Sequence, residues 1–207
     1  GNTTKKIVVV GMSCRFPGGI EGPAMFWDAI QAGRTLTGKV PFGRWDVDAL
    51  TSADNSLSEN AKKAMSFGGF IDDLEKFDNS AFKISPAEAV CMDPQQRLLL
   101  EYSFLAFHDA GYSKKDLEGK NVGVFVGISQ IDAAELGVLS TEPVSVYAAN
   151  GTTHSTAVGR ISFVFGLEGP CAAYDTACSS ALVALHAAVR CLQNGDCDLA
   201  LVAGVGA

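Results

Sequence analysis

Residues 171–182 read CAAYDTACSSAL, and this stretch decides the fold of the chain. Its first residues are small or apolar, which predicts a short strand over 171–175. Small residues then turn the chain, and a helix is predicted from Cys178 to Asn194. A reactive side chain at a helix start that follows directly on a strand is the arrangement of a nucleophile elbow, here with a thiol in place of a hydroxyl.

The predicted position of Cys178 suits nucleophilic chemistry. Backbone N–H groups at a helix N-terminus have no partner within the helix, and the positive end of the helix dipole favours thiolate over thiol. The same N–H groups can hold the oxyanion that forms when a thioester carbonyl is attacked. Ala177 and Ser179 are small and leave room for an acyl chain. On spacing alone two interpretations stay open, a nucleophile and a small cysteine buried at a helix start.

The helix after Cys178 has apolar residues at three- and four-residue spacing, namely Leu182, Leu185, Val189 and Leu192. This spacing places the four side chains on one face, which we expect to be buried. A buried face would hold the N-terminus of the helix rigidly, and Cys178 with it.

Strands alternate with helices along the rest of the chain, which predicts an α/β fold with a parallel or mixed sheet. Short apolar runs predict further buried strands at 7–11, 122–127 and 198–204. Helices are predicted at 23–31, from 85–88 onward, at 93–111 and within 151–166. The helix at 93–111 is apolar nearly all round and is therefore expected to be buried. Residues 34–66 lack a clear period and predict a long surface excursion with short helical pieces, the best at 61–65.

The composition of the 207 residues excludes several functions. A hydrophobic share of 47% with only 19% charged residues is typical of a folded globular domain. The net charge of −7 and the lack of a basic run argue against nucleic-acid binding. The longest apolar stretches are too short to span a bilayer, so no membrane segment is expected. With no secretory leader at the start, reduced thiols in the cytoplasm are the expectation, and a plastid or other organelle stays open.

The six cysteines and three histidines do not predict a metal site. No CxxC pair occurs, and no histidine lies at metal-ligand spacing from a cysteine. His186 lies eight residues after Cys178 on the same predicted helix, about 12 Å along its axis at ~1.5 Å per residue. It is therefore predicted to be a packed or hydrogen-bonded core residue. His108 is also expected to be structural, and His154 is the histidine placed near a loop.

Several segments resemble those of the β-ketoacyl synthases of modular and iterative polyketide synthases and of the related fatty acid synthases. The segment at 175–182 resembles their active-site signature, and MDPQQRLLLE at 92–101 is close to verbatim. The other matching segments follow in the family's order over about 5–207, at 9–19, 26–27, 41–46, 68–70, 77–78, 159–162 and 165–170. With this resemblance, Cys178 is predicted to be the nucleophile.

The chain also departs from the family pattern. Ala181 stands where the family usually has a third serine, and Gly204-Val205-Gly206 replaces the usual Gly-Gly-Val-Asn. In the family, two catalytic histidines, a lysine and a second oxyanion contributor lie in a C-terminal half that this sequence does not contain. None of those roles is assigned to a residue of this chain.

The resemblance implies a thiolase-like fold, in which two similar α/β halves stack in five layers, αβαβα. This chain would supply the N-terminal half, as one ketosynthase domain over 5–207. The resemblance also implies a homodimer in which the strand leading to Cys178 lies near the two-fold axis, with Cys171 and Tyr174 at the interface.

The implied reaction is acyl transfer to Cys178 followed by decarboxylative Claisen condensation with a malonyl thioester. No cofactor is expected to bind directly, because phosphopantetheine is carried by a partner acyl carrier protein. Arg15-Phe16-Pro17 and the excursion at 34–66 favour the polyketide side. The alternative is a non-catalytic half-domain that acts as a scaffold or as a split subunit. A papain-like protease is rejected, because its Cys-Gly-Ser-Cys-Trp context is absent.

Overall fold

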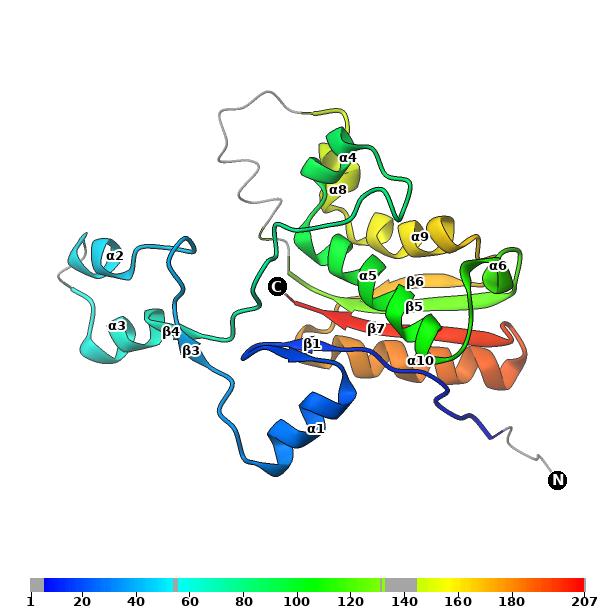
Figure 1. Ribbon diagram of the computed structural model, residues 1–207, viewed down its shortest axis with the longest axis horizontal. Helices are drawn as coiled ribbons and strands as arrows, with labels where there is room; N and C mark the ends of the chain where they lie inside the picture. The colour runs from blue at the N-terminus through cyan, green and yellow to red at the C-terminus, as the bar shows by residue number, and fades with distance from the viewer. Residues whose placement is uncertain (1–5, 54–55, 131, 133–144, 207) are drawn as a thin grey trace. The chain divides into compact units, whose positions relative to one another are not determined.

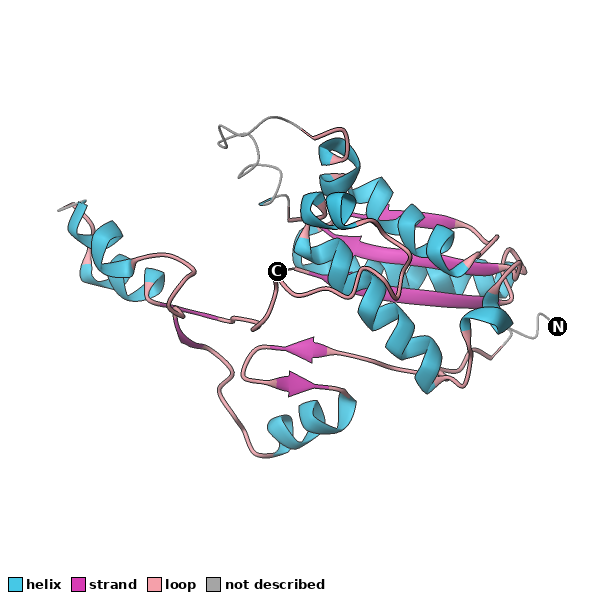
Figure 2. Cartoon of the chain, turned by 45° about the horizontal axis from the view of Figure 1, so that its top comes forward, coloured by secondary structure: helices cyan, strands magenta, loops and turns pink. Residues whose placement is uncertain are grey.

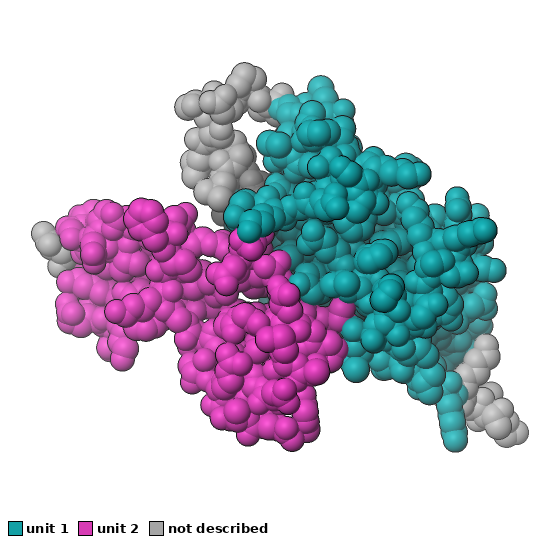
Figure 3. All heavy atoms as spheres, in the orientation of Figure 1, with its two compact units in different colours: residues 1–12, 75–207 teal, residues 13–74 magenta. Residues whose placement is uncertain are grey.

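The computed structural model describes residues 6–53, 56–130, 132 and 145–206. Two compact units divide the chain, as Figure 3 shows. Unit 1 comprises Gly1–Met12 and Glu75–Ala207, and unit 2 comprises Ser13–Leu74.

A three-stranded parallel sheet lies at the centre of unit 1 (Figure 1). Its strands, in order across the sheet, are β6 (Cys171–Tyr174), β5 (Val122–Ile128) and β7 (Leu199–Val205). All seven residues of β5 are buried, because β5 is paired on both sides and covered on both faces. The strands predicted at 122–127, 171–175 and 198–204 are confirmed, and so is the parallel sheet.

Helices cover both faces of this sheet, as Figures 1 and 2 both show. On one face lies α10 (Ser180–Asn194), and on the other lie α5 (Pro94–Asp109) and α9 (His154–Phe165). The larger core forms between β5 and the α5–α9 pair, with Leu100, Phe107, Val124, Val126, Ile161 and Phe165 among its members. A smaller cluster of Phe125, Ala184 and Ala188 joins α10 to the sheet.

Local interactions at the helix ends determine where the shorter helices of unit 1 begin and end. The Ser85 side chain accepts a hydrogen bond from the Glu88 N–H at 3.2 Å, which caps α4 (Pro86–Cys91) as the sequence predicts. The region 151–166 contains the end of α8 (Ala148–Thr152) and the whole of α9, which ends at Gly166 in the left-handed conformation. A further short helix of unit 1 is α6 (Lys114–Leu117).

Unit 2 is built from short elements. Strands β1 (Arg15–Phe16) and β2 (Ile20–Glu21) form an antiparallel hairpin, and α1 (Pro23–Gln31) follows as predicted. The region 34–66 contributes one strand and two short helices, and β3 pairs antiparallel with β4. Their bounds are β3 Gly38–Lys39, α2 Val47–Ala53, α3 Glu59–Met65 and β4 Phe67–Gly68. The extent of the excursion as a separate region stays a prediction.

The buried strand predicted at 7–11 is wrong. Residues 7–11 form no strand, and Val8 and Val9 are 75% and 76% exposed. Within the described residues the sheet ends at β7 on one side and β6 on the other, so this β-branched run has no strand to pair with. The run is instead anchored at its end, where the Met12 N–H donates to Asp109 Oδ2 at 2.8 Å.

The expectation that the helix at 93–111 is buried all round is also corrected. Phe104 and Leu105 of α5 are exposed, while Gln95, Gln96 and Ser103 are buried. The helix thus covers one face of the sheet and turns some apolar side chains away from it. No helix among the described residues is long and apolar enough to cross a membrane.

Candidate active site

Cys178 lies where β6 gives way to α10, beyond the carboxyl end of the strand. The turn that carries it is a short 3-10 helix, Ala177–Ser179, and α10 begins at Ser180, two residues later than predicted. The side chain of Cys178 is exposed to solvent. A cysteine buried in the core is thereby excluded, and the strand–turn–helix arrangement expected of an elbow is present.

The backbone immediately before Cys178 is in a rare conformation. Ala177 has φ +54°, in the left-handed region that a residue with a Cβ avoids at a cost of about 1–2 kcal/mol. Such a conformation persists only where surrounding contacts determine it. The conformation of the turn before Cys178 is therefore stabilised by neighbouring residues rather than by the intrinsic preference of Ala177.

Side-chain hydrogen bonds supply those contacts. The Ser180 hydroxyl accepts from the Thr176 N–H at 2.9 Å and donates to the Ala177 carbonyl at 2.7 Å. The Ser179 hydroxyl donates to the Thr176 carbonyl at 2.8 Å, and Asp175 Oδ1 accepts from the Ala177 N–H at 3.2 Å. Ser180 is only 5% exposed, so its two bonds are shielded from competing water.

Two glycines allow the start of α10 to approach the sheet backbone. A Cβ on Gly127 would lie 2.4 Å from the Ala181 nitrogen, and one on Gly204 would lie 2.7 Å from Ala181 Cβ. The two glycines face each other in the β5–β7 register. Gly127 was not predicted as a site residue from the sequence, although a glycine within a strand often marks such a close approach.

The buried face of α10 is not the leucine face that the sequence predicts. Leu182 is 70% exposed and Leu185 is exposed as well, whereas Ser180, Ala184 and Ala188 are buried. Small residues at four-residue spacing let the helix lie close to Phe125 of the sheet. The N-terminus of α10 is held firmly, as expected, but by its small side chains.

The other thiols differ from Cys178 in their surroundings. Burial raises the pKa of the Cys197 thiol, with weaker contributions from its acidic neighbours, and burial also raises the pKa of Cys14. Among the six cysteines, Cys171 and Cys178 are exposed. Cys171 lies on β6, an edge strand of the described sheet.

The structure contradicts the role predicted for one of the three histidines, His186. His186 is exposed on α10, so the predicted core role is wrong, and His108 is exposed with its ring against Phe104. His154, the first residue of α9, forms a hydrogen bond from Nε2 to the Gln130 carbonyl at 2.9 Å. In the part of the chain that the structure describes, no three His, Cys, Asp or Glu side chains cluster so as to hold a metal ion.

The MDPQQR segment forms a buried polar network at the start of α5. Asp93 Oδ1 caps the helix by accepting from the Gln95 N–H at 2.7 Å. The Gln95 amide donates to Asp93 Oδ2 at 3.1 Å and to the Gln130 carbonyl at 3.2 Å. Gln130 follows β5, and its Cγ lies 3.8 Å from where a Cβ on Gly206, just after β7, would stand. Gln95 and His154 therefore hold the segment that follows β5, at the carboxyl ends of the strands.

A second branch of this network joins α5 to α9 and α4. The Gln96 amide donates to the Asn150 carbonyl at 3.0 Å, and its oxygen accepts from Arg160 Nε at 3.0 Å. Arg160 also forms an ion pair with Glu88 and is largely buried. This segment stood out in the sequence through the resemblance and through its predicted helix start, and its role in joining three helices is visible only in the fold.

Comparisons with known proteins agree with this architecture. The family model described as "Beta-ketoacyl synthase, N-terminal domain" matches residues 4–207. The chain is 45% identical, over 98% of its length, to the phenolphthiocerol synthesis polyketide synthase type I Pks15/1 of Mycobacterium bovis. It is 42% identical over 96% of its length to the polyketide synthase GfsA of Streptomyces halstedii.

Solved structures show the same fold. A ketosynthase from module 6 of the bacillaene synthase of Bacillus subtilis 168 superposes with a TM-score of 0.81 at 36% identity, over 96% of this chain and 32% of that one. The oxazolomycin ketosynthase domain OzmH KS7 of Streptomyces albus JA3453 gives 0.80 at 33% identity, over 96% of this chain and 34% of that one. The fold is thus thiolase-like, as predicted. The chain spans 9% of the Mycobacterium relative and 3% of GfsA.

Proposed function

This chain belongs to the β-ketoacyl synthase family as its N-terminal domain, and on that premise we propose that Cys178 is the acyl-accepting nucleophile of a polyketide ketosynthase. The observation that carries the proposal is the exposed thiol on a left-handed turn between a parallel strand and a helix N-terminus. An exposed, rigidly held thiol is what covalent acyl transfer needs.

In the first stage the Cys178 thiolate attacks the carbonyl carbon of an acyl thioester. A new carbon–sulfur bond forms, the carbonyl electrons pass to oxygen, and the bond to the phosphopantetheine sulfur breaks as the tetrahedral intermediate collapses. The phosphopantetheine thiolate leaves and takes up a proton. The backbone N–H of Cys178, in the turn that leads into α10, stabilises the oxyanion while it exists.

In the second stage a malonyl thioester loses carbon dioxide, and its enolate carbon attacks the acyl-Cys178 thioester. The product is a β-ketoacyl thioester, and Cys178 is released as a thiolate. This stage needs donors that hold the enolate oxygen. The family places its two catalytic histidines in a C-terminal half, so this chain contributes the nucleophile to the condensation and not those donors.

The partners follow from the same chemistry. The acyl and malonyl groups arrive on the phosphopantetheine arm of an acyl carrier protein. We further propose a cytoplasmic homodimer in which β6, an edge strand among the described residues, lies at the two-fold axis with Cys171 and Tyr174 at the interface.

The test is intact-mass measurement after incubation of the protein with acyl thioesters of an acyl carrier protein. We expect a mass gain of one acyl group that is lost in Cys178→Ala and retained in Cys171→Ala, which removes the other exposed thiol. A gain that survives in Cys178→Ala, or no gain from folded wild-type protein, would refute the nucleophile role. No gain would favour the alternative of a non-catalytic scaffold domain.

A further inference from the structure

We propose that Ser180 is a positioning residue whose buried hydroxyl sets the orientation of the Cys178 backbone N–H, the group that meets the oxyanion. The inference rests on the proposed function of Cys178 as nucleophile. It concerns a hydroxyl that does not contact the substrate and acts through the peptide bond between Ala177 and Cys178.

The Ser180 hydroxyl spans the left-handed residue. The hydroxyl accepts a hydrogen bond from the N–H of Thr176, the residue before the left-handed Ala177. It donates a hydrogen bond to the carbonyl of Ala177, which follows the left-handed φ angle along the backbone. A serine hydroxyl has one hydrogen to donate and lone pairs to accept, and here it uses both capacities. The two bonds therefore hold the backbone on both sides of the rare conformation.

Fixing the Ala177 carbonyl also fixes the Cys178 N–H. The peptide group is planar and trans, so its C=O and N–H point in opposite directions. The Ala177 carbonyl is turned towards Ser180, which is buried and contributes both its hydroxyl and its backbone N–H to that oxygen. The Cys178 N–H is consequently turned away from Ser180. A relaxed Ala177 would rotate this peptide and misdirect the donor.

Ser179 provides a matched comparison within the same turn. Its hydroxyl donates to the Thr176 carbonyl at 2.8 Å and lies 2.9 Å from Thr176 Oγ1. Neither contact involves the peptide between Ala177 and Cys178. Ser179→Ala therefore removes a contact of the same turn but leaves both hydrogen bonds of the Ser180 hydroxyl in place.

Two reactions of the same sulfur separate positioning from a general structural effect. Acylation by a thioester passes through an oxyanion and needs the Cys178 N–H, whereas alkylation by iodoacetamide forms no oxyanion. In the full-length protein, we expect Ser180→Ala to slow acylation by about tenfold, the loss of roughly one hydrogen bond. Alkylation of Cys178, followed by peptide mass, should change by no more than about twofold. Ser179→Ala should slow acylation by no more than about threefold.

A double variant tests the conformational part of the argument. Glycine visits the left-handed region about as readily as the right-handed one. We therefore expect Ala177→Gly to recover about half of the lost acylation rate, on a logarithmic scale, when it is added to Ser180→Ala. If Ser180→Ala does not fold, Ala177→Val disfavours the same conformation with Ser180 intact and should show the same selective loss of acylation.

The possible outcomes distinguish the positioning role of Ser180 from a general structural effect and from a failure of the proposed function. Equal losses of acylation and alkylation in Ser180→Ala, or unchanged acylation, would overturn the inference while leaving Cys178 as the nucleophile. Failure of the wild-type Cys178 to accept an acyl group, with normal alkylation, would instead overturn the proposed function. Selective loss of acylation with rescue by glycine supports the positioning role.

Discussion

At the scale of single residues, burial separates the cysteines by reactivity. The thiolate is the species that attacks iodoacetamide and displaces iodide, and burial raises the pKa of Cys197 and of Cys14. We expect Cys178 to be alkylated before either of them at pH 8 under limiting reagent. Peptide mass spectrometry measures the order. Modification of Cys197 at the rate of Cys178 would contradict the burial argument.

The close approach of Gly127 to α10 predicts a second residue-scale effect. Gly127→Ala would place a Cβ 2.4 Å from the Ala181 nitrogen and push the helix start away from the sheet. We expect a loss of about 1–3 kcal/mol in the free energy of unfolding and reduced acylation of Cys178. Urea denaturation and intact mass measure the two effects.

Gly159 is the matched control for that substitution. It lies in α9, and a Cβ there would meet nothing within 4 Å. Gly159→Ala should leave stability unchanged or raise it by about 0.5–1 kcal/mol, because alanine loses less backbone entropy in a helix. If both variants lost a similar free energy of unfolding, the close contact at Gly127 would not be the cause of the destabilisation.

At the scale of elements, the Arg160 network predicts how strongly α9 depends on α5 and α4. Arg160→Met breaks the ion pair with Glu88 and removes the Nε donor to Gln96. Because the guanidinium is largely buried, we expect the free energy of unfolding to fall by about 2–4 kcal/mol. This loss is somewhat below the loss expected for a fully buried ion pair. Chemical denaturation measures it.

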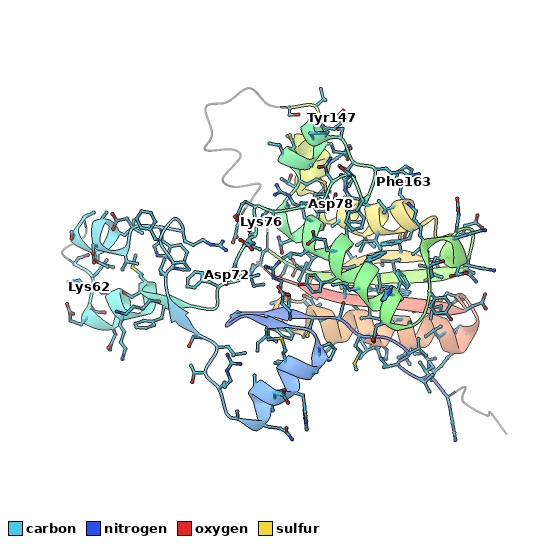
Figure 4. All side chains as sticks on the ribbon, in the orientation of Figure 1. Lys62, Asp72, Lys76, Asp78, Tyr147 and Phe163 are labelled. Carbon is cyan, nitrogen blue, oxygen red and sulfur yellow. The ribbon has the colours of Figure 1, made fainter. Side chains whose placement is uncertain are left out.

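An exposed ion pair supplies the comparison. Lys62, labelled in Figure 4, lies 3.1 Å from Glu59 on α3, and the glutamate is almost fully exposed. Lys62→Met should cost no more than about 0.5 kcal/mol, because exposed pairs are screened by solvent. Equal losses in the two variants would mean that burial does not strengthen the Arg160 network.

The cap of α6 predicts a dependence on pH. Hydrogen bonds from the Ser113 hydroxyl and N–H lower the pKa of Asp116 below its ordinary 3.8. A carboxyl with a lowered folded-state pKa stabilises the fold above its unfolded pKa, and the contribution is lost as pH falls through the folded pKa. Asp116→Asn should therefore lower stability at pH 7 and have progressively less effect below about pH 3.9. Denaturation at a series of pH values checks this, and a difference that grows in acid would contradict it.

At the scale of the whole molecule, several apolar side chains of unit 1 lie in contact with solvent. Leu182 and Leu185 share the outer side of α10, and Phe163 of α9 is exposed as well (Figure 4). In the five-layer arrangement of the family a second α/β half covers one face of the first. We expect the 207-residue chain alone to bind a hydrophobic fluorescent dye and a Leu182→Ser/Leu185→Ser variant to bind less. Phe163→Ser serves as the control on the opposite side of the sheet, and equal reductions would not support a special role for the leucine face.

Local patterns in the sequence were sufficient for the sheet, most helices and the elbow. The runs at 122–127 and 198–204 predict strands because apolar residues without interruption suit only a strand covered on both faces. Asp93 and Ser85 predict helix starts because their side chains satisfy N–H groups a few residues away. The strand–turn–helix junction that carries Cys178 is predicted in the same way. These elements depend on contacts between near neighbours in the chain, whereas the nucleophile role of Cys178 was predicted from the resemblance to the family.

Tertiary structure alone decided which faces of the helices are buried. A stripe of leucines and a stripe of small residues both repeat at helical spacing on α10, and only the close backbone of Gly127 and Gly204 selects the small one. The run at 7–11 has every local feature of a buried strand, yet pairing requires a partner that local pattern cannot supply. The left-handed Ala177 is a local feature that no sequence pattern predicts, because it depends on the Ser180 side chain folding back over the turn. The sequence by itself thus determined most of the elements and the position of Cys178 at the junction of β6 and α10, whereas packing between distant segments determined which face of α10 is buried beside it.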